Sequence, residues 1–183
     1  MFEVAELGRK TTKASFDERE PLLRTKLLEA QRALRDSDRS VVVIVSGVEG
    51  ARKSEVVNRL CEWLDPRGVQ THAYWDDSED ERVRPRYWRF WRRMPGRGTI
   101  GIMFGSWYTR PIVRRAFDEI DDAGFERELK KIEALEHVLA ADGVVFVKLW
   151  FHLSKDAQGR RLASLRAQRG TKEDPRKDKK KKD

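Results

Sequence analysis

The sequence predicts an α/β fold in which helices cover both faces of a mainly parallel sheet. Residues 41–45 are five β-branched residues without polar alternation, a pattern typical of a strand covered on both sides. Further apolar segments of strand character alternate with segments of helical periodicity. The strand at 41–45 also passes through a turn of small residues directly into a helix, which is the context of a phosphate-binding loop. Together these observations favour a three-layer fold of the P-loop NTPase type.

Each element follows from its residue pattern. Residues 16–36 carry leucines at helical spacing, so we expect an amphipathic helix that packs on the sheet, with Pro21 near its start. Residues 41–45 are expected to form the central strand. Residues 55–64 carry an apolar helical stripe that ends at the turn 65–68.

Three more strands and a helical region complete the expected order. The strands are predicted at 69–75, 100–104 and 144–151. Residues 112–141 between the last two are predicted to be helical, with an interruption at Gly124. The expected organisation is an N-terminal helical segment (1–38), a phosphate-loop domain (39–168) and a disordered basic tail (169–183).

The composition restricts the class of protein. The chain has 183 residues, of which 38% are charged, and no apolar run reaches the ~18 residues that a bilayer requires. We therefore expect no membrane contact. The single cysteine, Cys61, cannot form an internal disulfide, which favours a cytoplasmic protein.

Most of the net charge of +8 lies at the C-terminus. Residues 160–183 hold 11 basic and 4 acidic residues, which leaves 28 basic and 27 acidic residues in the remainder. The final segment has almost no apolar residue to bury, so disorder is expected. A lysine run of this kind is either a solubilising tail or an arm that binds a polyanion.

A second basic segment lies inside the nearly neutral remainder of the chain. Acidic residues at 76–81 are followed by a series of arginines that no acid interrupts. Trp88, Phe90 and Trp91 are interleaved with these arginines. The segment is either a solvated helix with local ion pairs or a site for phosphate, because the guanidinium fork binds two oxygens at once.

The turn after residue 45 matches much of the phosphate-loop pattern G-x-x-x-x-G-K-[ST]. Gly47, Lys53 and Ser54 agree with the pattern, whereas Arg52 occupies the place of the second glycine. An arginine there could add positive charge, crowd the site or occupy it. A tight turn without any ligand remains an alternative interpretation.

Four segments in this order resemble the polyphosphate kinase 2 family over roughly residues 20–165. They are SGVEGARKSEVVNRL, DPRGVQTHAYW, SEDERVRPRYWRFWRRMPGRGTIGIMFGSWYTRP and VVFVKLWFHLSKDAQGRRL. The sequences of these segments are most similar to the N-terminal half of polyphosphate:AMP phosphotransferases, in which two such domains are fused. The resemblance implies a phosphotransferase that uses inorganic polyphosphate, a nucleoside monophosphate or diphosphate, and Mg²⁺.

The resemblance also implies roles for individual residues. Glu49 and Lys53 stand at the acidic and basic positions of the family's phosphate loop, and Glu49 is the candidate Mg²⁺ ligand. Ser106, Tyr108 and Lys148 are implied to lie near the nucleotide or the lid. The residues expected to contact phosphate, in the loop or along the path of the polyanion, are Gly47, Gly50, Arg52, Ser54, Arg82, Arg89, Arg92 and Arg93.

Two departures from the family pattern predict a degenerate site. Phe104 and Gly105 stand where the family places an Asp and an Arg before Ser-Trp-Tyr. The family closes a lid over the site with the region after the strand at 144–151, but here HLSKDAQGRRLASLRAQRG leads directly into the lysine tail. The lid and the family's final strand and helix are therefore expected to be missing, as in a C-terminally truncated copy.

Three functions therefore remain open. The first is a polyphosphate-dependent nucleotide phosphotransferase that converts AMP to ADP. The second is a non-catalytic half of the same fold that binds polyphosphate or dimerises with an active partner domain, and a homo-oligomer or a partner domain is expected in either case. The third is a nucleic-acid-binding module that uses the basic tail.

Overall fold

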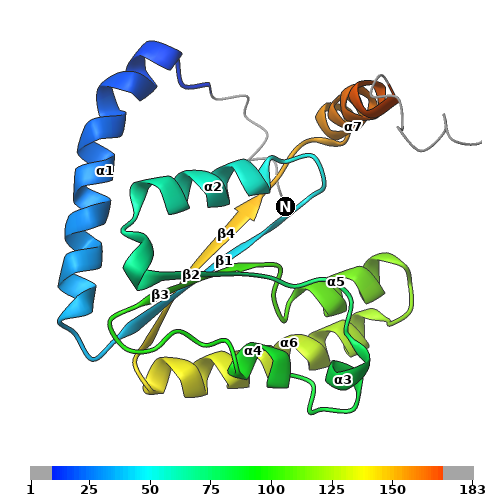
Figure 1. The fold of residues 1–183 in the computed structure, drawn as a ribbon. Helices are drawn as coiled ribbons and strands as arrows, with labels where there is room; N and C mark the ends of the chain where they lie inside the picture. Colours follow the sequence, from blue (N-terminus) through cyan, green and yellow to red (C-terminus); the bar gives the residue numbers. More distant parts are fainter. Residues whose placement is uncertain (1–9, 171–183) are drawn as a thin grey trace, which may run out of the picture.

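Four parallel strands form one sheet at the centre of the computed structural model, which describes residues 10–170. The strands are β1 (Ser40–Gly47), β2 (Val69–Ala73), β3 (Ile100–Phe104) and β4 (Val144–Phe151). Their order is β2-β3-β1-β4, and every pair is parallel. The expected central strand is therefore confirmed, since β1 has a strand on each side (Figure 1).

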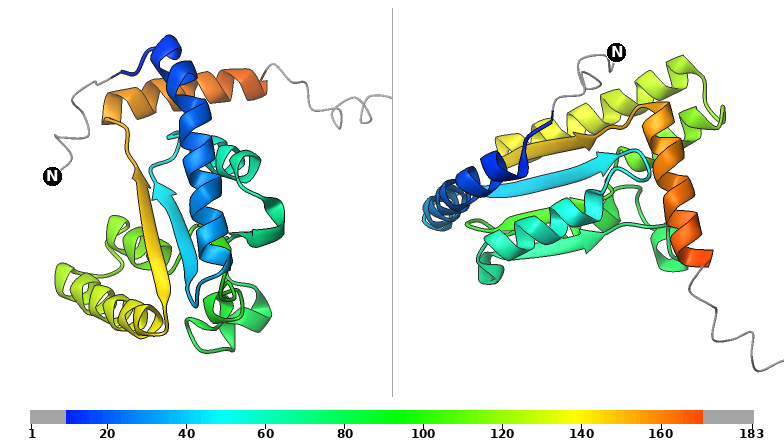
Figure 2. Two further views of the ribbon diagram at one scale, coloured as in Figure 1. Left: turned by 90° about the vertical axis from the view of Figure 1, so that its left-hand side faces the viewer. Right: turned by 90° about the horizontal axis from the view of Figure 1, so that it is seen from above.

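Helices cover both faces of this sheet, as predicted (Figures 1 and 2). The helices α1 (Lys13–Arg35) and α2 (Lys53–Trp63) lie on one side, and a single 3-10 turn, η2 (Pro66–Gly68), leads from α2 into β2. The other side carries α4 (Trp88–Trp91), α5 (Thr109–Ala116) and α6 (Asp122–Ala141). The short α3 (Glu79–Arg82) and the last helix, α7 (Lys155–Gly170), lie near the carboxyl ends of the strands.

Alternate residues of β1 supply a separate core to each face. Val42 and Ile44 pack with Ile132 and Trp107 on the face covered by α4, α5 and α6. The intervening Val43 and Val45 pack toward α2 on the opposite face. A strand buried on both faces needs such a continuous apolar sequence, which is why β1 was predictable from its five β-branched residues.

The first helix differs from its prediction in two respects. It begins at Lys13, where the Thr12 hydroxyl oxygen accepts a hydrogen bond from the Ser15 N–H, so Pro21 lies inside the helix and not near its start. Packing on the sheet is confirmed for its C-terminal half alone, because Leu27 and Leu34 contact the α2-side core. Three apolar residues of the N-terminal half are exposed: Phe16, Leu22 and Leu23.

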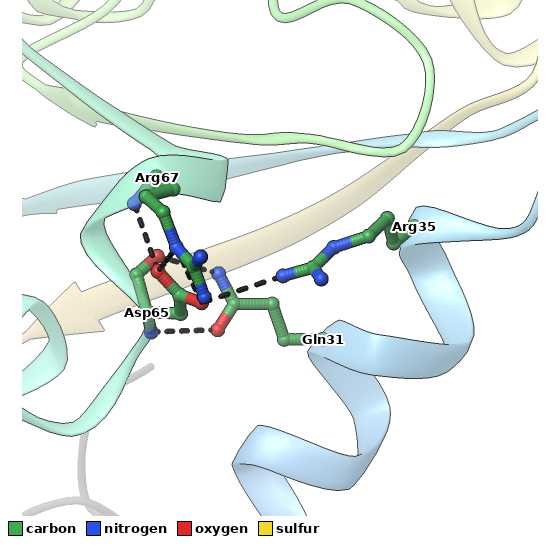
Figure 3. Close-up of polar contacts among 4 residues, drawn as sticks. All are labelled: Gln31, Arg35, Asp65 and Arg67. Carbon is green, nitrogen blue, oxygen red and sulfur yellow. Dashed lines mark hydrogen bonds and ion pairs between the residues drawn. The ribbon is translucent and has the colours of Figure 1, made fainter.

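A buried glutamine joins α1 to the turn before β2 (Figure 3). The Gln31 side chain is 4% exposed and makes two hydrogen bonds with the backbone of Asp65, donating to its C=O at 2.9 Å and accepting from its N–H at 2.8 Å. The Asp65 carboxylate accepts hydrogen bonds from Arg67 and a longer one from Arg35. These bonds, above all those from Arg67, hold the pKa of Asp65 well below its ordinary value.

The predicted helical region before β4 is divided at a different point. Residues 117–121 separate α5 from α6, and Gly124 lies in the first turn of α6, where its N–H donates to the Asp121 side chain. The interruption expected at Gly124 was therefore wrong, because Asp121 caps a new helix there.

The C-terminal part of the chain also differs from expectation. Residues 155–170 form α7, a helix that the sequence analysis did not predict. The predicted tail lies mostly in 171–183, outside the described residues, and the domain boundaries at 38 and 168 remain predictions. None of the helices in residues 10–170 combines the length and apolar character that crossing a membrane requires.

Candidate functional site

The loop between β1 and α2, residues 48–52, follows the central strand at the carboxyl end of the sheet. Gly47 ends β1 with a φ of 137°, and a Cβ added there would lie 2.1 Å from the Phe151 carbonyl oxygen. Gly50 has a φ of 83°. Both positions favour glycine, and the sharp turn that they allow brings the chain from β1 into the N-terminus of α2, the context in which backbone N–H groups can bind an anion.

Lys53 begins α2 and folds its side chain back against this loop. Its ammonium donates to the carbonyl oxygens of Gly47 at 2.9 Å and Val48 at 2.7 Å. Partial burial lowers the pKa of Lys53, and the negative charge of Glu49 opposes that shift. The chain thus holds a cation at the N-terminus of a helix, where the exposed N–H groups also favour negative charge.

Arg52 does not fill the loop. Its backbone has φ 57° and ψ 31°, the left-handed conformation that glycine adopts most readily. Its guanidinium turns outward to the Glu55 carboxylate at 3.1 Å, and both side chains are more than half exposed. The loop is therefore open to solvent on the side that the arginine could have obstructed.

Glu49 and Ser54 lie on either side of Lys53, and both are exposed. Neither side chain makes a hydrogen bond to another described residue in this loop region, which leaves a carboxylate and a hydroxyl available at the helix N-terminus. The Glu49 backbone is engaged, because its carbonyl oxygen accepts a hydrogen bond from the Gln158 amide at 3.2 Å.

The end of β3 carries Phe104 and Gly105 at the two positions where the family pattern has an Asp and an Arg, and both residues serve packing. The Phe104 ring packs with the α2-side core and lies 6.3 Å from the Trp75 ring. Gly105 has a φ of 82°, and a Cβ there would lie 3.1 Å from the Tyr74 carbonyl oxygen. Ser106 is 3% exposed, and its hydroxyl accepts from the Tyr108 N–H at 3.3 Å.

Tyr108 and Lys148 meet on the face covered by α6, around a carboxylate that the sequence did not reveal as functional. The Glu136 side chain accepts hydrogen bonds from Trp107 Nε1 at 3.0 Å and from the Tyr108 hydroxyl at 2.9 Å. Lys148 forms an ion pair with Glu136 and donates to the Tyr108 hydroxyl at 2.9 Å.

This network shifts the pKa of two of its members. Burial raises the pKa of Tyr108. For Lys148, burial lowers the pKa, but the hydrogen bonds with Glu136 and Tyr108 oppose burial and leave a raised value. The network borders a groove of about 720 Å³ between α6 and β4.

The groove is separate from the phosphate loop. Lys148 pairs with Ile44 in the sheet, whereas Phe151 pairs with Gly47 at the start of the loop. A strand rises ~3.3 Å per residue, so Lys148 lies roughly 10 Å before the loop. The structure therefore assigns Tyr108 and Lys148 to one cluster and Lys53 to another.

A third cluster is a basic cavity of about 520 Å³ between α3 and α5. Six arginines line it against two carboxylates, those of Asp77 and Glu81. The arginines are Arg82, Arg84, Arg86, Arg89, Arg110 and Arg114.

Of the four arginines that the sequence analysis expected to contact phosphate outside the loop, two line this cavity and two do not. Arg82 and Arg89 line it, but Arg89 is 13% exposed and is held by ion pairs with Asp77 and Glu81. Arg92 and Arg93 are exposed and lie outside its lining, and the Arg92 guanidinium is 4.6 Å from the centre of the Trp88 ring. The cavity therefore brings together two of the four arginines, and a role of all four along one polyanion path remains a prediction.

The sequence analysis missed Arg110 and Arg114, which α5 contributes to the cavity. Their spacing of four residues in TRPIVRR was the available signal, because residues at i and i+4 share one helix face. Arg110 lies 3.6 Å from Asp77, and Arg114 lies 3.5 Å from Glu119.

The last helix lies against the phosphate loop. Besides the Gln158 contact with Glu49, the Arg161 guanidinium lies 3.9 Å from the Glu55 carboxylate. A Cβ added to Gly50 would lie 3.3 Å from the Arg161 Cγ and 3.7 Å from the Leu162 Cδ2. An ordered element after β4 thus contacts the loop, although the sequence suggested that no lid was present.

Carboxylates are sparse around the loop, so a cation there would need other ligands. Within residues 10–170, no three His, Cys, Asp or Glu residues are grouped as a metal centre requires. Mg²⁺ commonly binds one or two protein carboxylates together with substrate phosphates and water. The exposed Glu49 carboxylate and Ser54 hydroxyl offer the kinds of oxygen ligand that this mode of binding uses, whereas Phe104 offers none.

Comparison with known proteins shows which family and which relatives this chain resembles. The family model described as polyphosphate kinase 2 matches residues 10–181. A polyphosphate:AMP phosphotransferase of Pseudomonas aeruginosa is 39% identical over 166 residues, and that of Pseudomonas syringae pv. tomato is 37% identical over 167 residues. These matches cover 90% and 91% of this chain.

Solved structures agree in fold. A crystal structure of a polyphosphate kinase 2 from Pseudomonas aeruginosa superposes with a TM-score of 0.83 at 39% identity, covering 88% of this chain and 35% of that one. A polyphosphate kinase 2 structure from Arthrobacter aurescens gives a TM-score of 0.78 at 26% identity, covering 86% and 58%. The chain spans 34% of the length of the two Pseudomonas phosphotransferases.

Proposed function

Because the chain belongs to the polyphosphate kinase 2 family, we propose that it binds inorganic polyphosphate and transfers a phosphoryl group from it to a nucleotide, with AMP as acceptor and ADP as product. The observation that carries this proposal is the open loop after β1, against which Lys53 holds a cation beside two carbonyl oxygens. The use of nucleotides accords with the cytoplasmic location that the single cysteine favours.

The roles of the loop residues follow from their positions. Lys53 would leave the Gly47 and Val48 carbonyls and bind the transferring phosphate, while N–H groups of the loop bind its other oxygens. Gly47 and Gly50 shape the turn. Ser54 and Glu49 would hold Mg²⁺, which, when bound, neutralises charge on the phosphates. Arg52 would reach phosphate after leaving Glu55.

The basic cavity is the proposed path of the polyanion. Polyphosphate carries a negative charge on each unit, and several guanidinium groups provide repeated pairs of donors. Arg82 makes no ion pair with a described residue, so its charge is available without breaking one. Arg89 is proposed to organise the cavity through Asp77 and Glu81 rather than to bind the substrate directly.

The helix α7 is proposed to cover the loop once substrate is bound. It contacts the loop through Gln158 and Arg161, and a cover that excludes water strengthens every charge interaction beneath it. Tyr108 and Lys148 are proposed to hold the strands in position through Glu136. Ser106 is buried, and its hydroxyl is proposed to stabilise the turn before α5 by accepting the hydrogen bond from the Tyr108 N–H.

We further propose that the site is degenerate and that turnover is slow. Phe104 and Gly105 bring neither a carboxylate nor a cation to the end of β3, and loss of one preorganised electrostatic group typically costs about 2.7–4 kcal/mol of transition-state stabilisation. This absence supports a second candidate function. The chain would then bind polyphosphate without catalysis, as one half of an assembly with a second copy or with an active partner domain.

A coupled assay tests these candidates. Chain, AMP, polyphosphate and Mg²⁺ are incubated, and ADP formation is followed through an ATP-regenerating luciferase step. Phosphotransfer predicts a signal that Lys53→Ala lowers by about 100- to 1,000-fold, whereas Lys131→Ala, which changes an exposed lysine on α6, leaves it unchanged. Polyphosphate binding without any signal above Lys53→Ala would establish the non-catalytic candidate instead.

A further inference from the structure

Trp75 follows β2 at the carboxyl edge of the sheet and is 75% exposed. Tryptophan is on average among the more buried residues of folded proteins. Within residues 10–170 its ring makes one contact with another ring, that of Phe104, at 6.3 Å between the centres. In sheets of parallel strands, ligands bind at the edge to which the strands point (Figure 2). The Trp75 ring is therefore a candidate surface for a ligand.

The alternation of residues along β2 places Trp75 on the sheet face that carries α2. The Thr71 hydroxyl lies 3.4 Å from the sulfur of Cys61 in α2, whereas Tyr74 packs against the core of the opposite face. Successive side chains of an extended chain alternate between faces, so Trp75 shares the side of Thr71. The contact with Phe104 agrees, because Phe104 packs with the α2-side core.

The phosphate loop lies on the same face and at the same edge. Phe104 packs in one cluster with Val57, which lies one helical turn after Lys53 in α2. One strand, β3, separates β2 from β1, and neighbouring strands lie ~4.8 Å apart, so Trp75 follows a strand roughly 10 Å from the one that enters the loop. This separation suits a nucleotide, whose base and phosphate lie on opposite sides of the ribose.

The backbone around the two rings is fixed by contacts within the chain. The Tyr74 N–H donates to the Phe104 carbonyl oxygen at 3.0 Å. A Cβ added to Gly105 would lie 3.1 Å from the Tyr74 carbonyl oxygen, so these two segments also touch one residue later. On the opposite face, the Tyr74 ring packs 4.6 Å from that of Phe90. A surface that is held in this way loses little conformational freedom when it binds a ligand.

We propose that the Trp75 ring, with Phe104 behind it, stacks on the base of the acceptor nucleotide and so directs the phosphate of that nucleotide to the loop before α2. This inference rests on the proposed function. It gives Phe104 a role of its own at the position where the family pattern has an Asp. Stacking tolerates any base, because every base presents a π face, so the ring supplies affinity more than choice among bases.

Titration calorimetry of the full chain with AMP and with ribose 5-phosphate tests the stacking site. Ribose 5-phosphate keeps the sugar and phosphate of AMP but has no base. The wild type is expected to bind AMP about 5- to 100-fold more tightly, which is the contribution of one stacked base. Trp75→Ala should remove most of that difference and leave the affinities for ribose 5-phosphate and polyphosphate unchanged. Trp75→Phe keeps a ring and should retain much of the difference.

Two further variants locate the effect. Phe104→Leu keeps an apolar side chain in the core but removes the ring behind Trp75, so it should weaken AMP binding by less than Trp75→Ala does. Phe117→Ala removes a ring that is also 75% exposed, at the C-terminal end of α5, and should bind AMP as the wild type does. Urea titration of each variant shows whether it is folded.

The outcomes separate this inference from the proposed function. A wild type that binds AMP no more tightly than ribose 5-phosphate overturns the stacking site, and so does a Trp75→Ala variant that keeps the full difference. Equal weakening of both ligands would make Trp75 a structural residue and overturns it as well.

ADP formation is measured on the same samples. AMP binding that depends on Trp75 but yields no ADP from polyphosphate refutes phosphotransfer and leaves the stacking site intact. Turnover with an unchanged KM for AMP in Trp75→Ala refutes the stacking site and leaves phosphotransfer intact.

Discussion

The Arg52 guanidinium lies 3.1 Å from the Glu55 carboxylate, on the outside of the phosphate loop. This pairing explains how an arginine is accommodated where the loop pattern has glycine. The backbone keeps the left-handed conformation, with φ 57°, that glycine would adopt, and the long side chain leaves the loop. The free-energy cost of having arginine in place of glycine here therefore comes from the left-handed backbone conformation.

Replacing Arg52 tests that conclusion. Alanine keeps the Cβ that disfavours the left-handed conformation, whereas glycine removes it, at a difference of about 1 kcal/mol. Both variants lose the exposed ion pair equally. We expect Arg52→Gly to exceed Arg52→Ala by about 1 kcal/mol in free energy of unfolding from urea titration. Equal stabilities would show that the loop backbone is not left-handed at this residue.

The arginines of the basic cavity should differ in their effect on polyphosphate. Arg82→Ala and Arg114→Ala each remove a guanidinium from the lining, so each should weaken polyphosphate binding by roughly 5-fold, the equivalent of about 1 kcal/mol. Arg92→Ala and Arg93→Ala remove charges outside the lining and serve as controls. Titration calorimetry at two salt concentrations measures the difference.

The salt dependence separates the cavity from general charge attraction. Removal of a cation that contacts the polyanion should lower the slope of log affinity against log salt by about one counterion. If all four variants weaken binding alike, polyphosphate is attracted by total charge and the cavity is not its path.

Gln31 should be essential for docking α1 onto the domain. Gln31→Ala leaves the Asp65 N–H and C=O without the amide that bonds both, in a buried position. We expect a loss of about 2–3 kcal/mol in free energy of unfolding. Arg35→Ala removes a half-exposed ion pair to the same aspartate and should cost below ~0.5 kcal/mol. Similar losses for both variants would contradict the role of the amide.

The sequence was sufficient for the sheet because its strands are encoded locally. Five consecutive β-branched residues identify β1, and the loop residues Gly47 and Lys53 follow it without interruption. The resemblance to the family then supplied the order of the remaining segments. Helix boundaries that depend on a capping residue were predicted less accurately, as the start of α6 after its cap Asp121 shows.

The clusters of the site depend on long-range packing and were less predictable. Glu136 lies 29 residues from Trp107 along the chain, and helical periodicity alone identifies it only as a polar residue of α6. Arg92 and Arg89 are similar in sequence context, yet Arg89 is buried among carboxylates and Arg92 stacks on Trp88. Charge counting cannot separate them, since burial depends on the whole fold.

His72 should make the stability of the domain sensitive to acid. It lies on β2 beside Tyr74, and its buried Nε2 makes no hydrogen bond to a described residue. Burial, assisted by the positive charge of Arg93, lowers the pKa of His72, so the folded chain favours the neutral ring. The unfolded chain takes up a proton near pH 6.5, before the folded chain does. Stability should therefore fall as the pH decreases through about 6.5.

A matched pair of variants isolates this residue. His72→Gln removes the titrating group, so its free energy of unfolding from urea titration should depend less on pH between about 7 and 5 than that of the wild type. His137→Gln changes an exposed histidine on α6 and should keep the wild-type dependence. Because protons bind the unfolded state in excess, the slope must be positive with increasing pH. A wild-type slope retained in His72→Gln would assign the acid sensitivity to other groups.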